Sequence, residues 1–421
     1  MSQRHYQVII IGDSLASSLA GVLLAKQGVR VLSFQNNASP SGPWFPSSLL
    51  LENILEGLSG RSCYTAPSPF QVITGDSRVE LNGPFPMEEE FRREFTADHP
   101  RLTATLGQLA KTAERFENLL WPKGILPLYG SASRLAFAWQ KLRSGWIKSE
   151  LDRPLSSLFA EFSGTAAGDF LQTLFSGLAQ RPLERLSVIE GALLWAGEIR
   201  ERAISPSGLD ALLRHRFEQF HGDVEELGAI QKIGAQGKRL AQIVLQNGGI
   251  CSADQYLIDA PQGFSLLPKE LQRPTDFQNH ALIATAAFPE AQFPALLAPR
   301  VLLAGKNPLR LTFVSRERQV QCTLKTFRSN GEAVPDTSEL QSCLDKLLPF
   351  SQASWQIVRP GETLPEQSRR SPFPGSCGPL KVAGNAIFHH GPGILPSLGA
   401  QGEVLAGLST ANRLLRLTRK K

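Results

Sequence analysis

The stretch VIIIGDSLASSLAGVLLAKQGVRVLSFQ, Val8 to Gln35, decides the fold of this 421-residue chain. It begins with an unbroken apolar, β-branched run, which is typical of a parallel strand buried on both faces. From Ser14 to Lys26 the apolar residues recur at helical spacing, and Gly28 follows as a helix stop. A second β-branched run, Val29 to Phe34, comes next. This order of strand, helix and strand predicts a parallel sheet covered by helices.

The composition is that of a globular protein, with 42% hydrophobic and 19% charged residues. Its five cysteines are scattered and form no C-x-x-C pair, which argues against a disulfide framework and against a metal site. Nucleic-acid binding is not expected, because no basic run is interleaved with aromatic residues. The polar start, Ser2 to Gln7, leads directly into a strand and does not resemble a signal peptide, so we expect a cytoplasmic protein.

The C-terminus concentrates positive charge beside leucines, within a chain of net charge +6. One interpretation is a helix that touches the inner face of an anionic membrane as a peripheral contact. The simpler interpretation is a solvated helix end whose cations suit the negative end of the helix dipole. The cations concerned are Arg413, Arg416, Arg419, Lys420 and Lys421.

The turn Gly12-Asp-Ser14-Leu-Ala-Ser17 has the spacing of a Rossmann dinucleotide-binding turn. In such turns three glycines allow a tight bend, close approach of the pyrophosphate and close helix packing, and an acid ends the second strand. Here Ser14 and Ser17 replace two glycines, and Gln35 replaces the acid. A serine forced to positive φ would cost about 1–2 kcal/mol, and losing the charged ribose contact about 1 kcal/mol. Weakened nucleotide binding and a Rossmann-like core that binds no nucleotide both remain open.

The rest of the chain alternates between helical and strand patterns. Asn36 to Pro86 is expected to be mostly loop. We expect short strands at 70–73, 78–81, 224–227, 229–233, 241–245 and 255–259, with a hairpin turn at Gly248-Gly249. An antiparallel group is expected at 301–303, 310–314 and 319–327, and a last strand at 380–383. Helices are expected at 87–120, 154–178, 187–202, 209–220 and 402–417.

Several segments resemble, in order, FAD-dependent flavoproteins of the phytoene desaturase and amine oxidase type. Ser207-Gly-Leu-Asp-Ala-Leu-Leu213 and the following Ile230-Gln-Lys-Ile233 are similar to a helix and short strand of that family. Ala253-Asp-Gln-Tyr-Leu-Ile-Asp-Ala260 is similar to its next long strand. The resemblance implies that the backbone of Ile230 meets the adenine of FAD.

The C-terminal part carries the most specific resemblance. Leu380-Lys-Val-Ala-Gly384-Asn385 is similar to the family's LYxAGD strand, and His389-His-Gly-Pro-Gly393 to the loop after it. Gln401-Gly402 is similar to the start of its last helix. The resemblance implies that Asn385 contacts the diphosphate or ribityl chain. It also implies that the helix start at Gly402 turns its positive dipole toward the pyrimidine edge of the flavin.

Other positions depart from the family pattern or stay unassigned. The family's Gly-Gly-Arg loop appears here as Ser41-Gly42-Pro43, without the arginine. The adjacent His389 and His390 could relay protons, but we favour loop histidines without a catalytic role, and no catalytic residue is identified. The resemblance implies ten cofactor-binding residues: Gly12, Ser14, Ser17, Gln35, Gly42, Ile230, Gly384, Asn385, Gly393 and Gly402.

Together these features predict an α/β fold with a Rossmann-like FAD/NAD(P)-binding domain and an interleaved α+β substrate domain. The first is expected from residues 1–75, 203–265 and 376–421, and the second from 76–202 and 266–375. The resemblance implies an FAD-dependent oxidoreductase in which flavin accepts a hydride or electrons from an apolar or amine-bearing small molecule. The alternative is a divergent, non-catalytic member that has lost FAD and serves as a binding or partner subunit.

Overall fold

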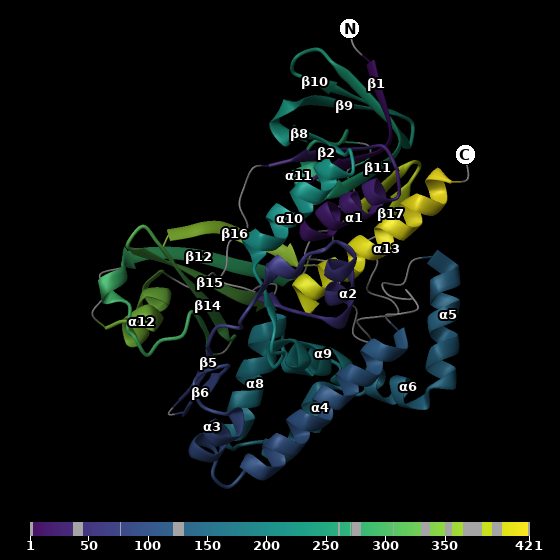
Figure 1. Cartoon of the computed structure of the whole chain (residues 1–421). Helices are drawn as coiled ribbons and strands as arrows, with labels where there is room; N and C mark the ends of the chain where they lie inside the picture. Colours follow the sequence, from purple (N-terminus) through teal and green to yellow (C-terminus); the bar gives the residue numbers. More distant parts are fainter. Residues whose placement is uncertain are drawn as a thin grey trace.

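The computed structural model describes residues 3–36, 45–75, 77–120, 130–259, 262–269, 271, 279–305, 307–329, 337–349, 356–364, 381–389 and 398–419. These residues form an eight-stranded sheet, a seven-stranded sheet, a small three-stranded sheet and a layer of helices (Figure 1). The predicted α/β class is confirmed.

The N-terminal strand, helix and strand form as the sequence predicts. They are β1 (Gln3–Ile11), α1 (Leu15–Lys26) and β2 (Val31–Gln35). β1 lies inside the eight-stranded sheet and pairs in parallel with a neighbour on each side. Its apolar run from Val8 to Ile11 is fully buried, which explains why it shows no polar alternation.

Distant segments complete this sheet, whose strand order is β17-β18-β11-β1-β2-β8. The first half of β11 pairs antiparallel with β10, which pairs with β9, and its second half pairs in parallel with β18. The last of these parallel strands, β18, was not predicted. The bounds are β8 (Asp223–Glu226), β9 (Ile230–Gln236), β10 (Arg239–Leu245), β11 (Ile250–Asp259), β17 (Lys381–Ala383) and β18 (Ala386–His389).

The seven-stranded sheet has the order β16-β12-β15-β14-β13-β5-β6 and is antiparallel except for the β13–β5 pair. β5, which lies before the expected domain boundary at residue 75, belongs to this sheet and pairs with β13 and β6. The strands β12 and β16 and the helix α12 were not predicted. The bounds are β5 (Phe70–Thr74), β6 (Ser77–Leu81), β12 (Asn279–Pro289), β13 (Arg300–Leu303), β14 (Leu309–Arg316), β15 (Gln319–Ser329), β16 (Gln356–Leu364) and α12 (Thr337–Leu347).

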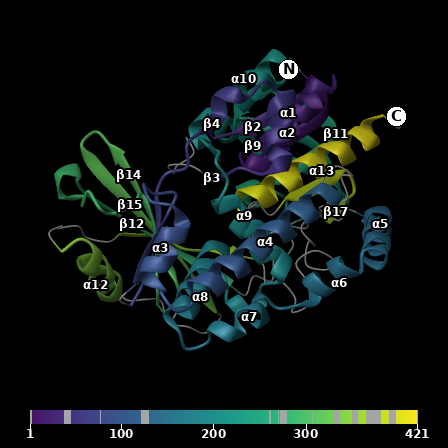
Figure 2. The same cartoon turned by 60° about the horizontal axis from the view of Figure 1, so that its bottom comes forward.

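The helical layer lies below both sheets (Figures 1 and 2). The single helix expected at 87–120 is two helices, because the chain turns at Phe95, whose ring packs on Phe91 and Phe170. A capping box of Ser187 and Glu190 begins the helix α9. The bounds are α3 (Met87–Glu94), α4 (His99–Leu120), α5 (Gly130–Arg143), α6 (Gly145–Asp152), α7 (Leu155–Leu158), α8 (Ala166–Ala179) and α9 (Val188–Glu198).

The last helix, α13 (Ala400–Thr418), packs along α1 and runs from the middle of the molecule to its edge (Figure 1). It makes a close approach at Gly407, where a Cβ atom would lie 2.7 Å from the Ala16 carbonyl oxygen. The remaining elements are α2 (Leu49–Gly57), α10 (Pro206–Gln219), α11 (Gln262–Ser265) and the three-stranded sheet of β3 (Phe45–Pro46), β7 (Ala203–Ile204) and β4 (Tyr64–Thr65).

We predict that Gly407→Val destabilises the protein by about 1–3 kcal/mol, because the added side chain pushes α13 away from α1. Denaturant unfolding followed by circular dichroism measures the change. Gly107→Val in α4 is the control, since a Cβ there meets no atom within 4 Å. Equal losses of stability in the two variants would contradict the close helix contact.

Candidate cofactor and substrate site

The carboxyl ends of three parallel strands meet at one edge of the eight-stranded sheet. Ile11 pairs with Ile258, which pairs with Phe388. The next residues along β1 and β11 are therefore Gly12 and Asp259, and the backbone of His389 lies beside Asp259. In open α/β sheets this edge is where ligands bind.

The turn at this edge is tight but unstrained at its serine. Gly12 has φ +131°, and a Cβ on it would lie 2.2 Å from the Cβ of Asp259. Ser14 has φ −62° and caps α1, its Oγ accepting the Ser17 N–H at 3.2 Å. The strain expected for a serine at positive φ is therefore absent, and that expectation was wrong. The hydroxyl instead fills the capping role that serine often has.

Asp259 occupies the start of α1 and was assigned no role from the sequence. Its Oδ2 accepts the Ser14 N–H at 2.9 Å, and the side chain is buried. Among the described residues, neither its Oδ1 nor the buried Oγ of Ser17 makes a hydrogen bond. Buried polar atoms without partners are rare and mark places for a ligand or a water. The first turn of α1 also leaves the N–H groups of Leu15 and Ala16 without intrahelical partners.

The charge of Asp259 depends on pH near neutrality. Burial raises the pKa of Asp259 to about 6, which outweighs the opposing effects of the Ser14 side chain, the Ser14 N–H and the Ser17 side chain. The nearby carboxylate of Asp13 adds to the rise. Above about pH 6 the edge therefore carries a buried negative charge where a phosphate would approach, and below it a neutral carboxyl that can donate a hydrogen bond.

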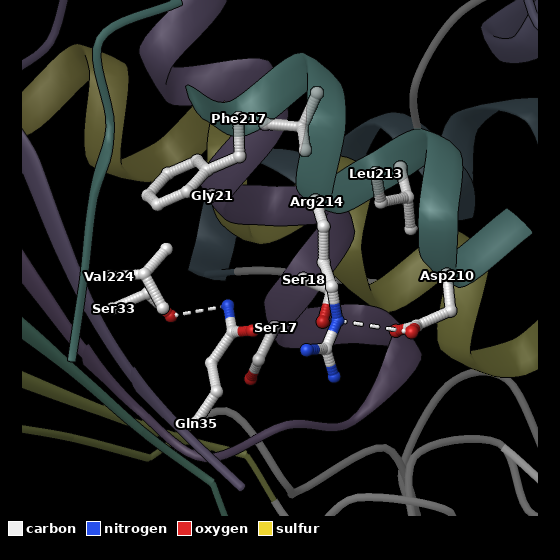
Figure 3. Close-up of a pocket in the computed structure, with 11 residues that line it drawn as sticks. Ser17, Ser18, Gly21, Ser33, Gln35, Asp210, Leu213, Arg214, Phe217 and Val224 are labelled. Atoms are coloured by element: carbon white, nitrogen blue, oxygen red, sulfur yellow. Dashed lines mark hydrogen bonds and ion pairs between the residues drawn. The ribbon is translucent and has the colours of Figure 1, made fainter. Parts of the chain in front are cut away.

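Gln35 ends β2, where the Rossmann pattern has an acid. Figure 3 shows its amide nitrogen donating to Ser33 Oγ, at 2.9 Å, beside a small pocket between α1 and α10. The guanidinium of Arg214 points into the same space and pairs with Asp210 at 3.0 Å. The pocket volume of about 10 Å³ holds about one water molecule and no ribose. A ribose bound by Gln35 must therefore lie outside this pocket.

The structure does not bring Asn385 to the edge that holds Gly12. Asn385 precedes β18, three residues before Phe388, so it lies about 10 Å from the carboxyl end. Its buried amide both accepts the Leu240 N–H and donates to the Leu240 carbonyl, each at 2.9 Å. Gly384, at φ +60°, makes the turn before it, and a Cβ there would lie 2.2 Å from the Lys238 carbonyl oxygen. The Gly-Asn pair thus docks on the β9–β10 hairpin.

The remaining expected contacts differ in how far the structure describes them. Ile230 begins β9 with its side chain in the core under the sheet. Gly402 lies in the buried first turn of α13. Gly42, Gly393 and His390 lie outside the described residues, and only the backbone of His389 is described.

The start of α13 carries another buried polar atom without a partner. Gln401 Nε2 faces the Ser47 carbonyl oxygen at 3.5 Å, while its Oε1 makes no hydrogen bond among the described residues. Gly407 of α13 touches the first turn of α1. Gln401 lies six residues before Gly407, which is about 9 Å along α13. The N-termini of α1 and α13 are thus close enough for one ligand to contact both. Such a ligand would carry a diphosphate linked by a short chain to a ring system.

A buried ion pair stands beside the start of α13. Arg300 of β13 donates two hydrogen bonds, at 2.9 and 3.0 Å, to the carboxylate of Glu198 at the end of α9. Both side chains are buried, and the guanidinium stacks over the ring of Phe70 at 4.7 Å. The preceding Gly197 is so close to α13 that a Cβ on it would lie 2.6 Å from Gln401 Nε2. The second sheet, the helical layer and α13 therefore meet here.

Arg310 adds a second positive charge at this junction. Leu311 and Phe313 of β14 face the core under α12, so Arg310 lies on the opposite face of the sheet, next to Leu302. Burial and the neighbouring Arg300 lower the pKa of Arg310 to about 10, and Glu198 opposes the shift only in part. The side chain is half-buried, and no ion pair joins it to another described residue. It is a cation suited to an acceptor or anionic group of a ligand.

Comparison with solved structures relates the fold of nearly the whole chain to that of two amine oxidases and another oxidoreductase. Putrescine oxidase bound to putrescine matches with a TM-score of 0.56 and 12% identity over 99% of this chain and 100% of that one. Cyclohexylamine oxidase from Brevibacterium oxydans matches with a TM-score of 0.55 and 14% identity, over 98% and 99%. An oxidoreductase from Methanosarcina mazei has a TM-score of 0.51 and 12% identity over 96% and 99%. At these identities the likeness establishes the fold.

Comparisons at the level of sequence add nothing to this. No protein-family model matches the chain, and no curated protein sequence is significantly similar to it. Within the described ranges, no cluster of three or more histidine, cysteine or acidic side chains could hold a metal ion.

Proposed function

We propose that this chain, which has the fold of FAD-dependent oxidoreductases of the amine oxidase type, is itself a flavin-dependent oxidoreductase. The observation that carries the proposal is the pair of helix N-termini, at α1 and α13, each with a buried polar atom that has no hydrogen-bond partner among the described residues. Such termini attract an elongated anionic ligand.

The described residues offer hydrogen-bond donors for the diphosphate of FAD, and they suit its charge when Asp259 is protonated. The N–H groups of Leu15 and Ala16 and the Ser17 hydroxyl would hold the diphosphate, while a neutral Asp259 would donate to it. The start of α13, around Gly402, would face the pyrimidine edge and stabilise negative charge there. FAD, when bound, supplies the chemistry by accepting a hydride or electrons from an organic substrate.

The substrate would lie between the start of α13 and the face of the second sheet that carries Arg310. This face is not purely apolar, because Thr312 follows Arg310 on the same side of β14. We therefore infer a substrate with an acceptor or anionic group for Arg310, in place of the wholly apolar one expected from the desaturase resemblance. The ion pair of Glu198 and Arg300 would hold the sheet and α9 in register around it.

A second function is favoured by one observation. Asp259 caps the N–H group of Ser14 by itself, so the start of α1 is partly satisfied without any ligand. A chain that keeps this fold as a binding or partner subunit would need only this capping of the Ser14 N–H by Asp259, without a cofactor. Absence of FAD binding in the wild type at every pH, and equally after removal of the Asp259 charge, would support this second function.

The direct test is titration of the purified chain with FAD, followed by quenching of flavin fluorescence at about pH 6. We expect saturable binding of FAD. Gly402→Asp should weaken this binding about tenfold, since the variant adds a buried negative charge at the start of α13, where the positive end of the helix dipole would face the flavin. Asn412→Asp is the matched control, because it makes the same change in charge at an exposed site on the same helix. Equal affinities in the two variants would remove the start of α13 from the site.

A further inference from the structure

The helix α5 exposes an apolar stripe to solvent. Leu135, Trp139 and Leu142 are 74%, 63% and 76% exposed. Their spacing of four and three residues places them on one side of the helix. Ala138 between them is exposed as well. Single exposed apolar residues are common, but a continuous apolar patch usually marks an interaction surface.

The opposite side of α5 attaches the helix to the body of the protein. Phe137 is 2% exposed and belongs to the main hydrophobic core. The views in Figures 1 and 2 both place α5 at the rim of the molecule, outside the layer formed by α4, α8 and α9. The stripe therefore faces away from the fold, and the proposed cofactor edge does not use it.

The charged residues of α5 itself have one sign. From Leu135 to Ser149 the chain contains no acidic residue, whereas it contains Lys141, Arg143 and Lys148. Arg143 and Lys148 are exposed. An apolar stripe flanked by cations is the pattern of helices that lie in the interface of an anionic membrane.

The C-terminal end of α13 lies on the same side of the molecule as α5. Figures 1 and 2 are related by a turn about the horizontal axis, and both place the two elements at the right-hand side. Arg416 and Arg419 at this end are exposed. The end of α13 thus adds exposed cations on the side of the molecule where α5 lies.

We propose that α5 is the element through which this protein binds an anionic lipid surface, with the end of α13 as an electrostatic contact. Among the described residues no helix has the length and apolarity needed to cross a bilayer, so the binding would be peripheral. A second copy of the chain is a poorer occupant of the stripe, because the cations that flank it would face each other across the interface. This proposal does not depend on FAD binding.

Co-sedimentation of the full chain with vesicles tests it. We expect binding to phosphatidylcholine vesicles with about 30 mol% phosphatidylglycerol, and much weaker binding without the anionic lipid or at high salt. Leu135→Ser, Trp139→Ser and Leu142→Ser combined should lower the partition coefficient at least tenfold. Trp139→Phe should retain binding but lose the part of the vesicle-induced tryptophan blue shift that Trp139 contributes.

The matched control is Phe85→Ser combined with Leu296→Ser. These residues are 59% and 77% exposed and lie together at a different surface pocket, so their loss removes exposed apolar area away from α5. We expect this variant to bind vesicles like the wild type. Three results would each overturn the proposal: no binding of the wild type to anionic vesicles, equal binding by the triple variant, or a dimer in sedimentation velocity that the triple variant dissolves.

Discussion

Replacing Asp259 by asparagine is expected to raise the affinity for FAD about 100-fold at about pH 8. The pKa of about 6 leaves the wild-type carboxylate charged two pH units above it, and a proton must be taken up before a diphosphate can bind beside it. That uptake costs about 2.7 kcal/mol, or roughly tenfold in affinity per pH unit. Titrations of wild type and variant from about pH 5.5 to pH 8 measure it.

The expected pH profiles distinguish the two proteins. The wild type should lose affinity for FAD steadily as the pH rises above 6, whereas the variant should bind with little dependence on pH. Asp254→Asn is the control, since it removes a carboxylate from the same strand, β11, away from the edge. A pH-independent wild type would show that Asp259 does not face the ligand.

The same substitution should also change stability without any ligand. A carboxyl whose pKa rises from 3.8 when unfolded to about 6 when folded stabilises the fold at low pH, where it is protonated in both states. This stabilisation is lost as the pH rises from about 4 to about 6. Above that range the fold is less stable than at low pH by about 3 kcal/mol. The advantage of Asp259→Asn in unfolding free energy should therefore be near zero at pH 4 and largest above pH 6.

Removing the carboxylate of Glu198 is expected to destabilise the protein by about 3–5 kcal/mol. Glu198→Ala leaves the guanidinium of Arg300 buried without its doubly hydrogen-bonded partner and next to a second cation, Arg310. The loss should appear as a lower denaturant midpoint with an unchanged slope. Glu201→Ala, three residues further on and exposed, should change the unfolding free energy by no more than about 0.5 kcal/mol.

A double variant separates the charge effect from packing. Replacing both Glu198 and Arg300 by methionine removes the pair together and keeps the volume apolar, so much of the stability should return. If the double variant is as unstable as Glu198→Ala, the charge of Arg300 does not cause the loss of stability. Packing at the junction of α9 and β13 would then be the cause.

The sequence predicted the elements whose patterns are local. The buried run of β1 and the helical spacing of α1 are visible in the residues themselves, and both formed as expected. The strand β18 was missed because its short run, Ala386 to Phe388, forms a strand through pairing with β11 and β17. The motif Gly384-Asn385 resembled the end of a cofactor strand. In the structure the Asn385 side chain is hydrogen-bonded to the backbone of Leu240 in β10.

The site was predicted less completely, for a related reason. Gly12 and Ser14 were identified as candidates from spacing, whereas Asp259 ends an ordinary strand 245 residues after Ser14. Only the register of β1 and β11 places its carboxylate on the Ser14 N–H. An acid at the end of a buried parallel strand was the available signal, and the residues alone do not show which neighbour it would meet.

The eight-stranded sheet is assembled from segments that lie far apart in the chain, and this has a consequence for folding during synthesis. β1, β2 and α1 emerge first from the ribosome, but β11 arrives more than 200 residues later, and β18 and α13 come almost last. Until then the apolar faces of β1 and α1 have no permanent cover. We expect the nascent N-terminal unit to depend on chaperones and to become protease-resistant only once α13 has been released.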